Sequence, residues 1–371
     1  MTRPLFTLAL ATALTACGGG GSNTADTDAT TAAATATATA AGATLVAAPS
    51  GSIAYQLVAD VGDSLTITFN TTTREYSARV DATQFNFADR VGTFNSTNSG
   101  DFTTYTLGSD NYKLVVDNRT KAIAGNMSMI TENGTEKAFT VAGTGYQISD
   151  LSKLAGTYNF AYNTRNQSNG QDNDKGMGQL KISSDGAIAT LCTSGTVNAS
   201  NTCDAIAAGV APELNTLTLT ISNGLITVSN NGTEWGKLRV HTGDLGLSLI
   251  IDRYGVNGSG VLRVGALYAV KAQTLAAGSG NGTWACNRLG VATNSFTVSG
   301  TALTNTPVGG SAQSGTIQYN QAGTGSSLVS VPGFVAMGSN DTNFLPLSSS
   351  LLVASYIADS TQPLTICRKA S

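Results

Sequence analysis

The stretch Leu217–Val228, LTLTISNGLITV, decides the fold class of this chain. Apolar and polar residues alternate over Leu217–Ser222, which is the pattern of a strand with one buried face. A second short apolar run follows at Leu225–Val228, and Asn223-Gly224 stands between the two. Both of these residues tolerate the positive φ angles of a tight type I′ turn. Strands joined by two residues run antiparallel, so the stretch predicts a β-hairpin.

The same pattern recurs along most of the chain. Three further hairpin turns are expected at Asn133-Gly134, Asp185-Gly186 and Asn231-Gly232. Helices are expected only at 150–155 and at 204–209, the second capped by its aspartate, Asp204. The sequence therefore predicts an all-β fold, with antiparallel meanders forming β-sandwich or up-and-down barrel domains after a disordered N-terminal tether.

The composition agrees with a β-rich exported protein. Charged residues make up 12% of the 371 residues, and glycine is abundant at 42. Soluble domains usually carry about 25% charged residues. Here Thr, Ser and Asn supply the polar surface, which suits strands and turns. The formal net charge is −3 and no basic cluster stands out, so no nucleic-acid partner is expected.

The N-terminus predicts export. Arg3 precedes an apolar stretch over Leu5–Ala16 that is too short to cross a bilayer, which needs about 20 residues. It ends in Leu14-Thr15-Ala16-Cys17, which resembles the lipobox of bacterial lipoproteins. The resemblance implies a signal peptide at 1–16, diacylglycerol on the Cys17 thiol and a further acyl chain, such as palmitate, on its amino group. Since Gly18 and not aspartate follows, it also implies the outer membrane. An ordinary secretory signal with Cys17 incidental is the alternative.

The mature chain divides into a tether and two β-rich parts. Residues 17–50 are Gly, Ala, Thr and Ser with few large apolar side chains, and predict a lipidated flexible tether. An N-terminal β domain is expected at 51–146, and a C-terminal β-rich region at 150–371 with a sub-boundary near 276–282. Gly282-Thr283-Trp284 repeats Gly156-Thr157-Tyr158, and both resemble the Gly-x-Trp opening of lipocalin-type barrels. Three residues assign no family.

Four cysteines remain after Cys17, and an even number in an exported chain predicts two disulfides. Three pairings are open, of which the nearest-neighbour one is Cys192–Cys203 and Cys286–Cys367. The sequence contains no Cys-x-x-Cys pair and only one histidine, so no zinc site is expected.

No catalytic motif stands out. Nucleophile elbows, P-loops and zinc-protease helices are absent from the sequence. A Ser-His-Asp triad would have to use His241, with Asp244 or Asp252 as its orienting acid. Because His241 alternates with Leu238 and Val240, we expect it on the polar, solvated face of its strand. The sequence therefore predicts no catalytic residue.

Two other groups are candidate binding residues. Asp172 and Asp174 lie in a polar loop whose oxygens could hold calcium, but Lys175 follows and no glutamate closes the site, so a hydrated hairpin loop is favoured over metal. Trp235 and Trp284 could form a face that binds sugars or proteins, but each lies in a strand pattern where an aromatic ring usually fills the core. Neither a metal nor a cofactor is predicted.

These observations favour a non-enzymatic binding or adhesion module, anchored through its lipid in the bacterial cell envelope, with a protein or glycan ligand. A secreted hydrolase with an unrecognised carboxylate pair is the first alternative. The second is a structural envelope component without a soluble ligand. A deep cleft with two carboxylates would favour the hydrolase, a closed and filled body the structural role, and an open barrel mouth the binding role.

Overall fold

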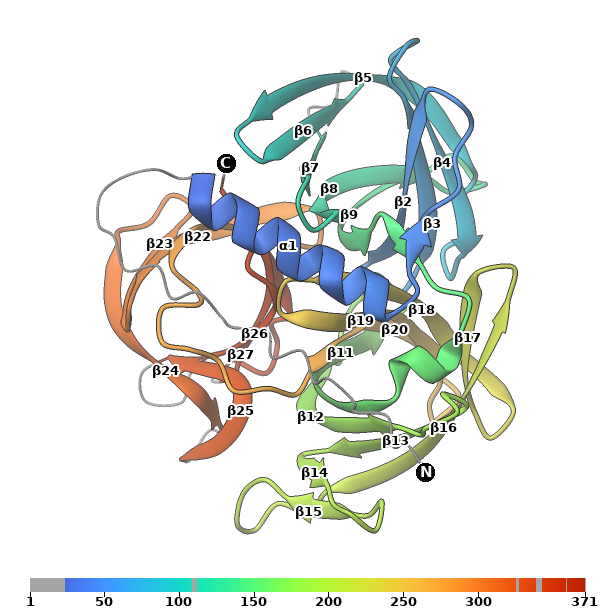
Figure 1. Cartoon of the computed structure of the whole chain (residues 1–371). Helices are drawn as coiled ribbons and strands as arrows, with labels where there is room; N and C mark the ends of the chain where they lie inside the picture. Colours follow the sequence, from blue (N-terminus) through green and yellow to red (C-terminus); the bar gives the residue numbers. More distant parts are fainter. Residues whose placement is uncertain (1–23, 109–111, 325–326, 338–341, 358, 371) are drawn as a thin grey trace, which may run out of the picture.

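A computed structural model describes residues 24–108, 112–324, 327–337, 342–357 and 359–370. Three antiparallel sheets each close into an eight-stranded barrel. The barrels follow one another along the chain and pack side by side (Figure 1). The predicted all-β class is confirmed, and of the two architectures expected from the sequence the barrel is the one present.

Each barrel is an uninterrupted meander apart from one excursion in the second. The first barrel contains β2 (Ser52–Ala59), β3 (Ser64–Asn70), β4 (Glu75–Ala82), β5 (Arg90–Ser99), β6 (Phe102–Leu107), β7 (Tyr112–Asp117), β8 (Ala122–Ile130) and β9 (Glu136–Thr144). The second contains β11 (Gly156–Asn166), β12 (Asp174–Ile182), β13 (Ile188–Thr193), β16 (Glu213–Ser222), β17 (Leu225–Asn230), β18 (Thr233–Gly243), β19 (Gly246–Val256) and β20 (Leu262–Lys271). The third contains β21 (Gly282–Arg288), β22 (Val291–Ser299), β23 (Ala302–Pro307), β24 (Gln313–Gly323), β25 (Leu328–Met337), β26 (Thr342–Ser348), β27 (Leu351–Tyr356) and β28 (Thr365–Lys369).

The predicted hairpins all form, with two kinds of turn. At Asn223-Gly224 and Asn231-Gly232 both residues have positive φ, between 48° and 79°, as a type I′ turn requires. At Asn133-Gly134 and Asp185-Gly186 only the glycine has positive φ. There the glycine N–H donates to the carbonyl three residues earlier, and the loops are one residue or more longer than a type I′ turn.

The N-terminal segment differs from the predicted flexible tether. Thr24–Ala40 forms helix α1, which lies across the packed barrels against β18 and β19 (Figure 1). Ala34 and Ala38 of the helix are buried, as is Ala41 directly after it. Alanine has the highest helix propensity, and its small side chain allows close packing on the strands. The short strand β1 (Thr44–Leu45) then pairs with β10 (Tyr146–Gln147). Residues 1–23, with the signal, the lipobox and Cys17, lie outside the described residues.

The two predicted short helices have different outcomes. A 3₁₀ turn, η1 (Leu151–Leu154), is capped by the Asp150 side chain, which accepts from the Ser152 N–H. The helix predicted at 204–209 is wrong, because Cys203–Ala205 forms strand β15 and pairs with β14 (Gly195–Val197). Backbone hydrogen bonds to a neighbouring strand outweigh the local capping signal here.

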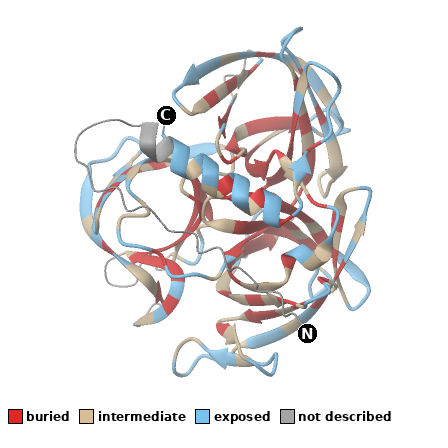
Figure 2. Ribbon diagram, in the orientation of Figure 1, coloured by how far each residue is buried: buried red, intermediate tan, exposed pale blue. Residues whose placement is uncertain are grey.

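Four apolar clusters hold the molecule together. Three of them fill the interiors of the three barrels. The fourth, here called the junction cluster, lies on the outer faces where the barrels meet (Figure 2). Its buried members are Val58, Ala122, Ala124, Ala142, Ala161, Ile250, Ala266, Tyr268, Val270, Ala322, Val331, Phe334, Leu345, Leu347, Leu351, Val353, Leu364 and Ile366. Strands such as β20 are therefore buried on both faces.

Turns of one barrel reach closely into the next. Gly62, with φ of 85°, lies in the turn between β2 and β3, and a Cβ there would be 2.8 Å from the Gly265 nitrogen of the second barrel. Gly290, with φ of 80°, lies between β21 and β22, and a Cβ there would be 2.8 Å from the Phe139 nitrogen of the first barrel. Only glycine satisfies both the backbone conformation and the space.

The two ends of the second barrel differ. Ala41, Ile148, Leu151 and Leu154, all from the segments before β11, pack against its core cluster. The closeness of Gly186 to Leu151 places them at the end where β12 turns into β13. That end is therefore plugged. The opposite end, where β11 turns into β12 and β17 into β18, opens into a cavity.

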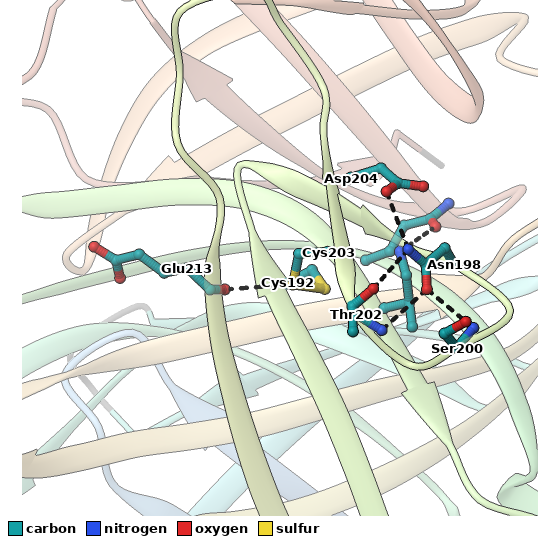
Figure 3. Close-up of a disulfide and its surroundings, with 9 residues drawn as sticks. Cys192, Asn198, Ser200, Thr202, Cys203, Asp204 and Glu213 are labelled. Atoms are coloured by element: carbon teal, nitrogen blue, oxygen red, sulfur yellow. Dashed lines mark hydrogen bonds between the residues drawn. A yellow bond between two sulfur atoms is a disulfide. The ribbon is translucent and has the colours of Figure 1, made fainter.

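Both expected disulfides are present. Cys286 and Cys367 are directly paired across β21 and β28, the first and last strands of the third barrel. Cys192 on β13 bonds to Cys203 on β15 and fastens the β14–β15 excursion to the second barrel (Figure 3). Within that excursion the Asn198 side chain accepts from the Ser200 and Thr202 N–H groups, both at 3.0 Å.

The Gly-Thr-aromatic repeat corresponds to a shared structural feature. Each copy opens a barrel, at Gly156 in the second and Gly282 in the third. The Tyr158 hydroxyl donates to the Leu154 carbonyl at 2.8 Å, and the Trp284 indole donates to the Gly280 carbonyl at 3.0 Å. In both barrels the aromatic ring thus ties the start of the first strand to the carbonyl four residues earlier.

Candidate functional site

The open end of the second barrel contains a cavity of about 460 Å³, called here the mouth chamber. This volume is in the range of small-ligand pockets, about 300–1,000 Å³. Its walls come from the ends of β11, β12, β17, β18, β19 and β20. The lining residues are Thr164, Asp174, Asn230, Asn231, Thr233, Glu234, Trp235, Arg253, Gly255, Val256, Asn257 and Arg263.

A β-bulge places Trp235 in the chamber. In the pairing of β17 with β18, Val228 lies opposite Gly236 and Ser229 opposite Glu234, so Trp235 is the extra residue. Strict alternation from the inward Leu238 would turn Trp235 outward. The bulge turns the ring inward instead. The Trp235 ring therefore packs against the core of the second barrel and also lines the chamber.

Arg253 forms the floor of the chamber. It follows the inward residues Leu249 and Ile251 on β19 with the same alternation. Its guanidinium carbon lies 4.2 Å from the centre of the Trp235 ring and 5.7 Å from that of Tyr162. Burial lowers the pKa of Arg253, while Tyr162 and Asp174 oppose this. Among the described residues the Arg253 guanidinium has no hydrogen-bond or ion-pair partner.

The second arginine of the chamber is fully engaged. Arg263 forms an ion pair with the Asp172 carboxylate at 2.5 Å and donates to the Asp172 carbonyl, also at 2.5 Å. It further donates to the Thr164 carbonyl at 2.9 Å and to the Asn166 side chain at 3.1 Å. Arg263 therefore fixes the loop between β11 and β12.

The same contacts bear on the calcium candidates. The carboxylate of Asp172 faces the Arg263 guanidinium, which occupies the place of a cation. Asp174 lies 3.3 Å from the Tyr162 hydroxyl. In the part of the chain that the structure describes, no group of three or more His, Cys, Asp or Glu residues could hold a metal ion. The loop between β11 and β12 is thus a hairpin loop bound by Arg263.

Glu234, at the chamber rim, is held as a carboxylate. The Lys237 ammonium lies 2.6 Å from it, and the Tyr254 hydroxyl donates to it. Burial raises the pKa of Glu234, but the hydrogen bonds from Lys237 and Tyr254 outweigh this and leave the pKa lowered. A general acid needs the opposite shift.

A second large cavity, of about 370 Å³, lies between the second and third barrels. Its polar side chains are largely taken up in holding the two barrels together. Lys175 donates to the carbonyls of Tyr356, Asp359 and Gln362, the last at 3.1 Å. Asn343 of the third barrel donates to the Met177 sulfur of the second at 3.1 Å. The mouth chamber, with its unengaged arginine, is the better candidate for a ligand site.

His241 lies elsewhere, and the prediction of a solvated side chain is wrong. Its strand face is the predicted one, opposite Leu238 and Val240, but the residue is 0% exposed. Ser348 of the third barrel lies close by, at Gly243. Burial lowers the pKa of His241 to about 4, although Asp244 and Asp117 act in the opposite direction. The outer face of β18 is covered by another barrel and not by water.

The triad considered from the sequence is not assembled. Neither ring nitrogen of His241 has a hydrogen-bond partner within the described residues, so no acid orients it. Asp252 instead accepts from the Lys237 backbone N–H. Burial raises the pKa of Asp252 to about 8. These buried groups belong to the packing between barrels.

Arg239 makes a buried ion pair between barrels. Its Nη2 lies 2.7 Å from the Asp81 carboxylate of the first barrel, and its side chain is 0% exposed. The sequence places Arg239 on the same face as His241. Removing one partner of such a pair is strongly destabilising, since the other charge stays buried.

The tryptophans have different roles. Trp284 is 1% exposed and lies in the core of the third barrel, as favoured from the sequence. Trp235 is also mostly buried but presents its ring to Arg253 and to the chamber.

Arg253 was not identified from the sequence. The available signal was its position, two residues after Ile251 and four after Leu249, on the inward face of the same strand. None of the described helices is long and apolar enough to cross a membrane.

Comparisons with known proteins add little. The sequence matches no protein-family model and no curated protein. Among solved structures, one similar chain is the vaccine antigen transferrin binding protein B from Haemophilus parasuis, with 10% identity and a TM-score of 0.19, covering 83% of this chain and 65% of that one. Another is transferrin binding protein B from serogroup B Neisseria meningitidis, with 9% identity and a TM-score of 0.17, covering 84% and 66%. The chain thus spans just under two thirds of their length, and similarity at this level carries no argument.

Proposed function

We propose that this chain is a lipid-anchored binding module of the bacterial cell envelope, with its ligand site in the mouth chamber. The observation that carries the binding role is a barrel plugged at one end and open at the other into a cavity of about 460 Å³. This cavity is floored by Arg253, which has no hydrogen-bond or ion-pair partner among the residues that the structure describes. The resemblance of Leu14-Thr15-Ala16-Cys17 to a lipobox supports the anchor.

The alternatives fit these features less well. A glycoside hydrolase with a carboxylate pair needs one protonated carboxyl as general acid, but Glu234 is kept ionised by Lys237 and Tyr254. A purely structural component needs no chamber of this size, since the cores of all three barrels are already filled with apolar side chains. A binding role accounts for both features, the filled barrel cores that form a rigid support and the open end of the second barrel.

Blocking the chamber tests the binding role. Thr233 is exposed and lines the chamber, so Thr233→Trp places a large ring in it. We expect the full chain to bind a subset of glycans on an array, and Thr233→Trp to weaken that binding at least about tenfold. The matched control is Thr218→Trp, on the exposed outer face of the same barrel, which should bind as the unaltered chain does. Equal binding by both variants, or no binding by the unaltered chain, would remove the chamber from the proposal.

The anchor is tested separately through Cys17. Cys17→Ser removes the thiol that receives the lipid, so it should abolish labelling by a fatty-acid probe and release the chain from membranes, because two or more acyl chains are needed for stable anchoring. The double variant Cys192→Ser/Cys203→Ser is the control and should keep both the label and the membrane association. A Cys17→Ser chain that stays labelled and membrane-bound contradicts the lipoprotein assignment.

A further inference from the structure

The unengaged arginine of the mouth chamber indicates which ligand the chamber takes. Arg253 lines the chamber and is only half-buried, so its guanidinium can be reached from the barrel mouth. Its neighbour Arg263 shows how the chain satisfies such a group, with an ion pair and further hydrogen bonds to Asp172, Thr164 and Asn166. Within the described part of the chain, Arg253 contacts the ring faces of Trp235 and Tyr162 and has no hydrogen-bond or ion-pair partner. Its N–H donors remain for a ligand.

The guanidinium itself limits the shape of the group that Arg253 can bind. It is planar, so its N–H donors lie in one plane. A carboxylate lying in that plane can accept two parallel hydrogen bonds. Arg253, held beside the Trp235 ring, therefore suits a planar, two-oxygen acceptor.

The rest of the lining limits the charge of the ligand. Asp174 and Glu234 also line the chamber, and both repel a second anionic group. Five neutral polar residues also line the chamber, and their amides and hydroxyls suit uncharged hydroxyl groups: Thr164, Asn230, Asn231, Thr233 and Asn257. The chamber thus combines one anion-binding arginine, an aromatic ring and a neutral polar rim.

We propose that the mouth chamber binds a sugar unit with a single carboxylate, placing that carboxylate on Arg253 and the sugar hydroxyls on the amide rim. This inference rests on the proposed binding function and adds the chemical class of its ligand. Arg253 acts as the specificity-determining residue.

Three ligands that share one ring test this directly: glucuronate, glucose and glucose 6-phosphate. They differ only at carbon 6, with a carboxylate, a hydroxyl and a dianionic phosphate. Titration calorimetry on the full chain should show glucuronate binding at least about tenfold tighter than glucose, since a hydrogen bond to a charged group contributes at least that factor. Glucose 6-phosphate should bind more weakly than glucuronate, because Asp174 and Glu234 repel its second charge.

Variants of Arg253 locate the effect. Arg253→Met should remove the preference for glucuronate over glucose. Arg253→Lys should keep only part of that preference, because an ammonium lacks the planar fork. The matched control is Arg74→Met. Arg74 stacks on Phe94 in the first barrel at 5.8 Å, far along the chain from the chamber, and its loss should leave all three affinities unchanged. A thermal melt of each variant checks that it is folded.

The outcomes separate this inference from the proposed function. The carboxylated-sugar assignment is wrong if glucose and glucuronate bind equally, if glucose 6-phosphate binds tightest, or if Arg253→Met keeps the preference for glucuronate. In each of these cases the proposed binding function still holds, provided that Thr233→Trp weakens binding. Absence of glucuronate binding at millimolar concentration also overturns the assignment. If in addition Thr233→Trp changes no binding on the array, the binding function itself falls.

Discussion

Replacing Cys286 and Cys367 together with alanine is expected to lower the free energy of unfolding of the third barrel by about 4–5 kcal/mol. The two residues are 81 positions apart and join the first strand of this barrel to its last. On the chain-entropy account, the cross-link restricts the unfolded chain, and it does so more for a longer loop. The bond also lies at the closure of the barrel, so its loss acts where β21 and β28 must find each other.

The two tryptophans make the effect measurable barrel by barrel. Trp284 lies in the third barrel and Trp235 in the second, and the chain contains no other tryptophan. Fluorescence-detected denaturant unfolding of a Trp235→Phe background follows the third barrel alone. The control is Cys192→Ala/Cys203→Ala, whose bond spans 11 positions and contributes about 3 kcal/mol, followed in a Trp284→Phe background. A smaller loss for the Cys286 pair than for the Cys192 pair would contradict this account.

Replacing Asp252 with asparagine is expected to change the pH dependence of stability by about 4 kcal/mol between pH 5 and pH 8. Burial raises the pKa of Asp252 to about 8, from 3.8 in the unfolded chain. The folded state therefore keeps a proton that the unfolded state releases, and stability is lost as pH rises from about 4 to about 8. Each pH unit in that window costs about 1.4 kcal/mol. Asparagine cannot ionise, so the variant lacks this loss.

The comparison between the two chains isolates Asp252. Asp63, with a pKa raised by burial to about 7, and His241, with a pKa lowered by burial to about 4, titrate in both. Unfolding in denaturant at pH 5, 7 and 8 should give curves that diverge with rising pH, with the variant more stable at pH 8. Asp204→Asn, at an exposed carboxyl of the same barrel region, should stay within about 0.5 kcal/mol of the unaltered chain at every pH. Parallel curves for Asp252→Asn would show that its carboxyl ionises normally in the fold.

Much of the barrel architecture follows from short-range signals in the sequence. Leu217–Val228 predicts two strands and their turn, and the structure contains that hairpin as β16 and β17. Asn-Gly and Asp-Gly pairs locate the other turns because few residues adopt positive φ. These properties depend on neighbours within a few positions, so they can be recognised before any tertiary contact is known.

The mouth chamber could be predicted only in part. Arg253 continues the inward alternation of Leu249 and Ile251, so its direction is implied by the sequence once β19 is recognised. The position of Trp235 is not, because it depends on a bulge in the pairing of β17 with β18. A bulge is a property of two strands together, and one extra residue reverses the side on which a ring lies.

The alternation of Leu238, Arg239, Val240 and His241 shows what the sequence can predict and what it cannot. By itself it determined which residues share a face, since successive side chains of a strand point to opposite sides. It did not determine what lies over each face. Leu238 and Val240 fill the second barrel, while Arg239 and His241 are buried against neighbouring barrels and not solvated. Only the packing of three barrels decided this, because burial depends on segments distant in the chain, whereas periodicity records only the geometry of a single strand.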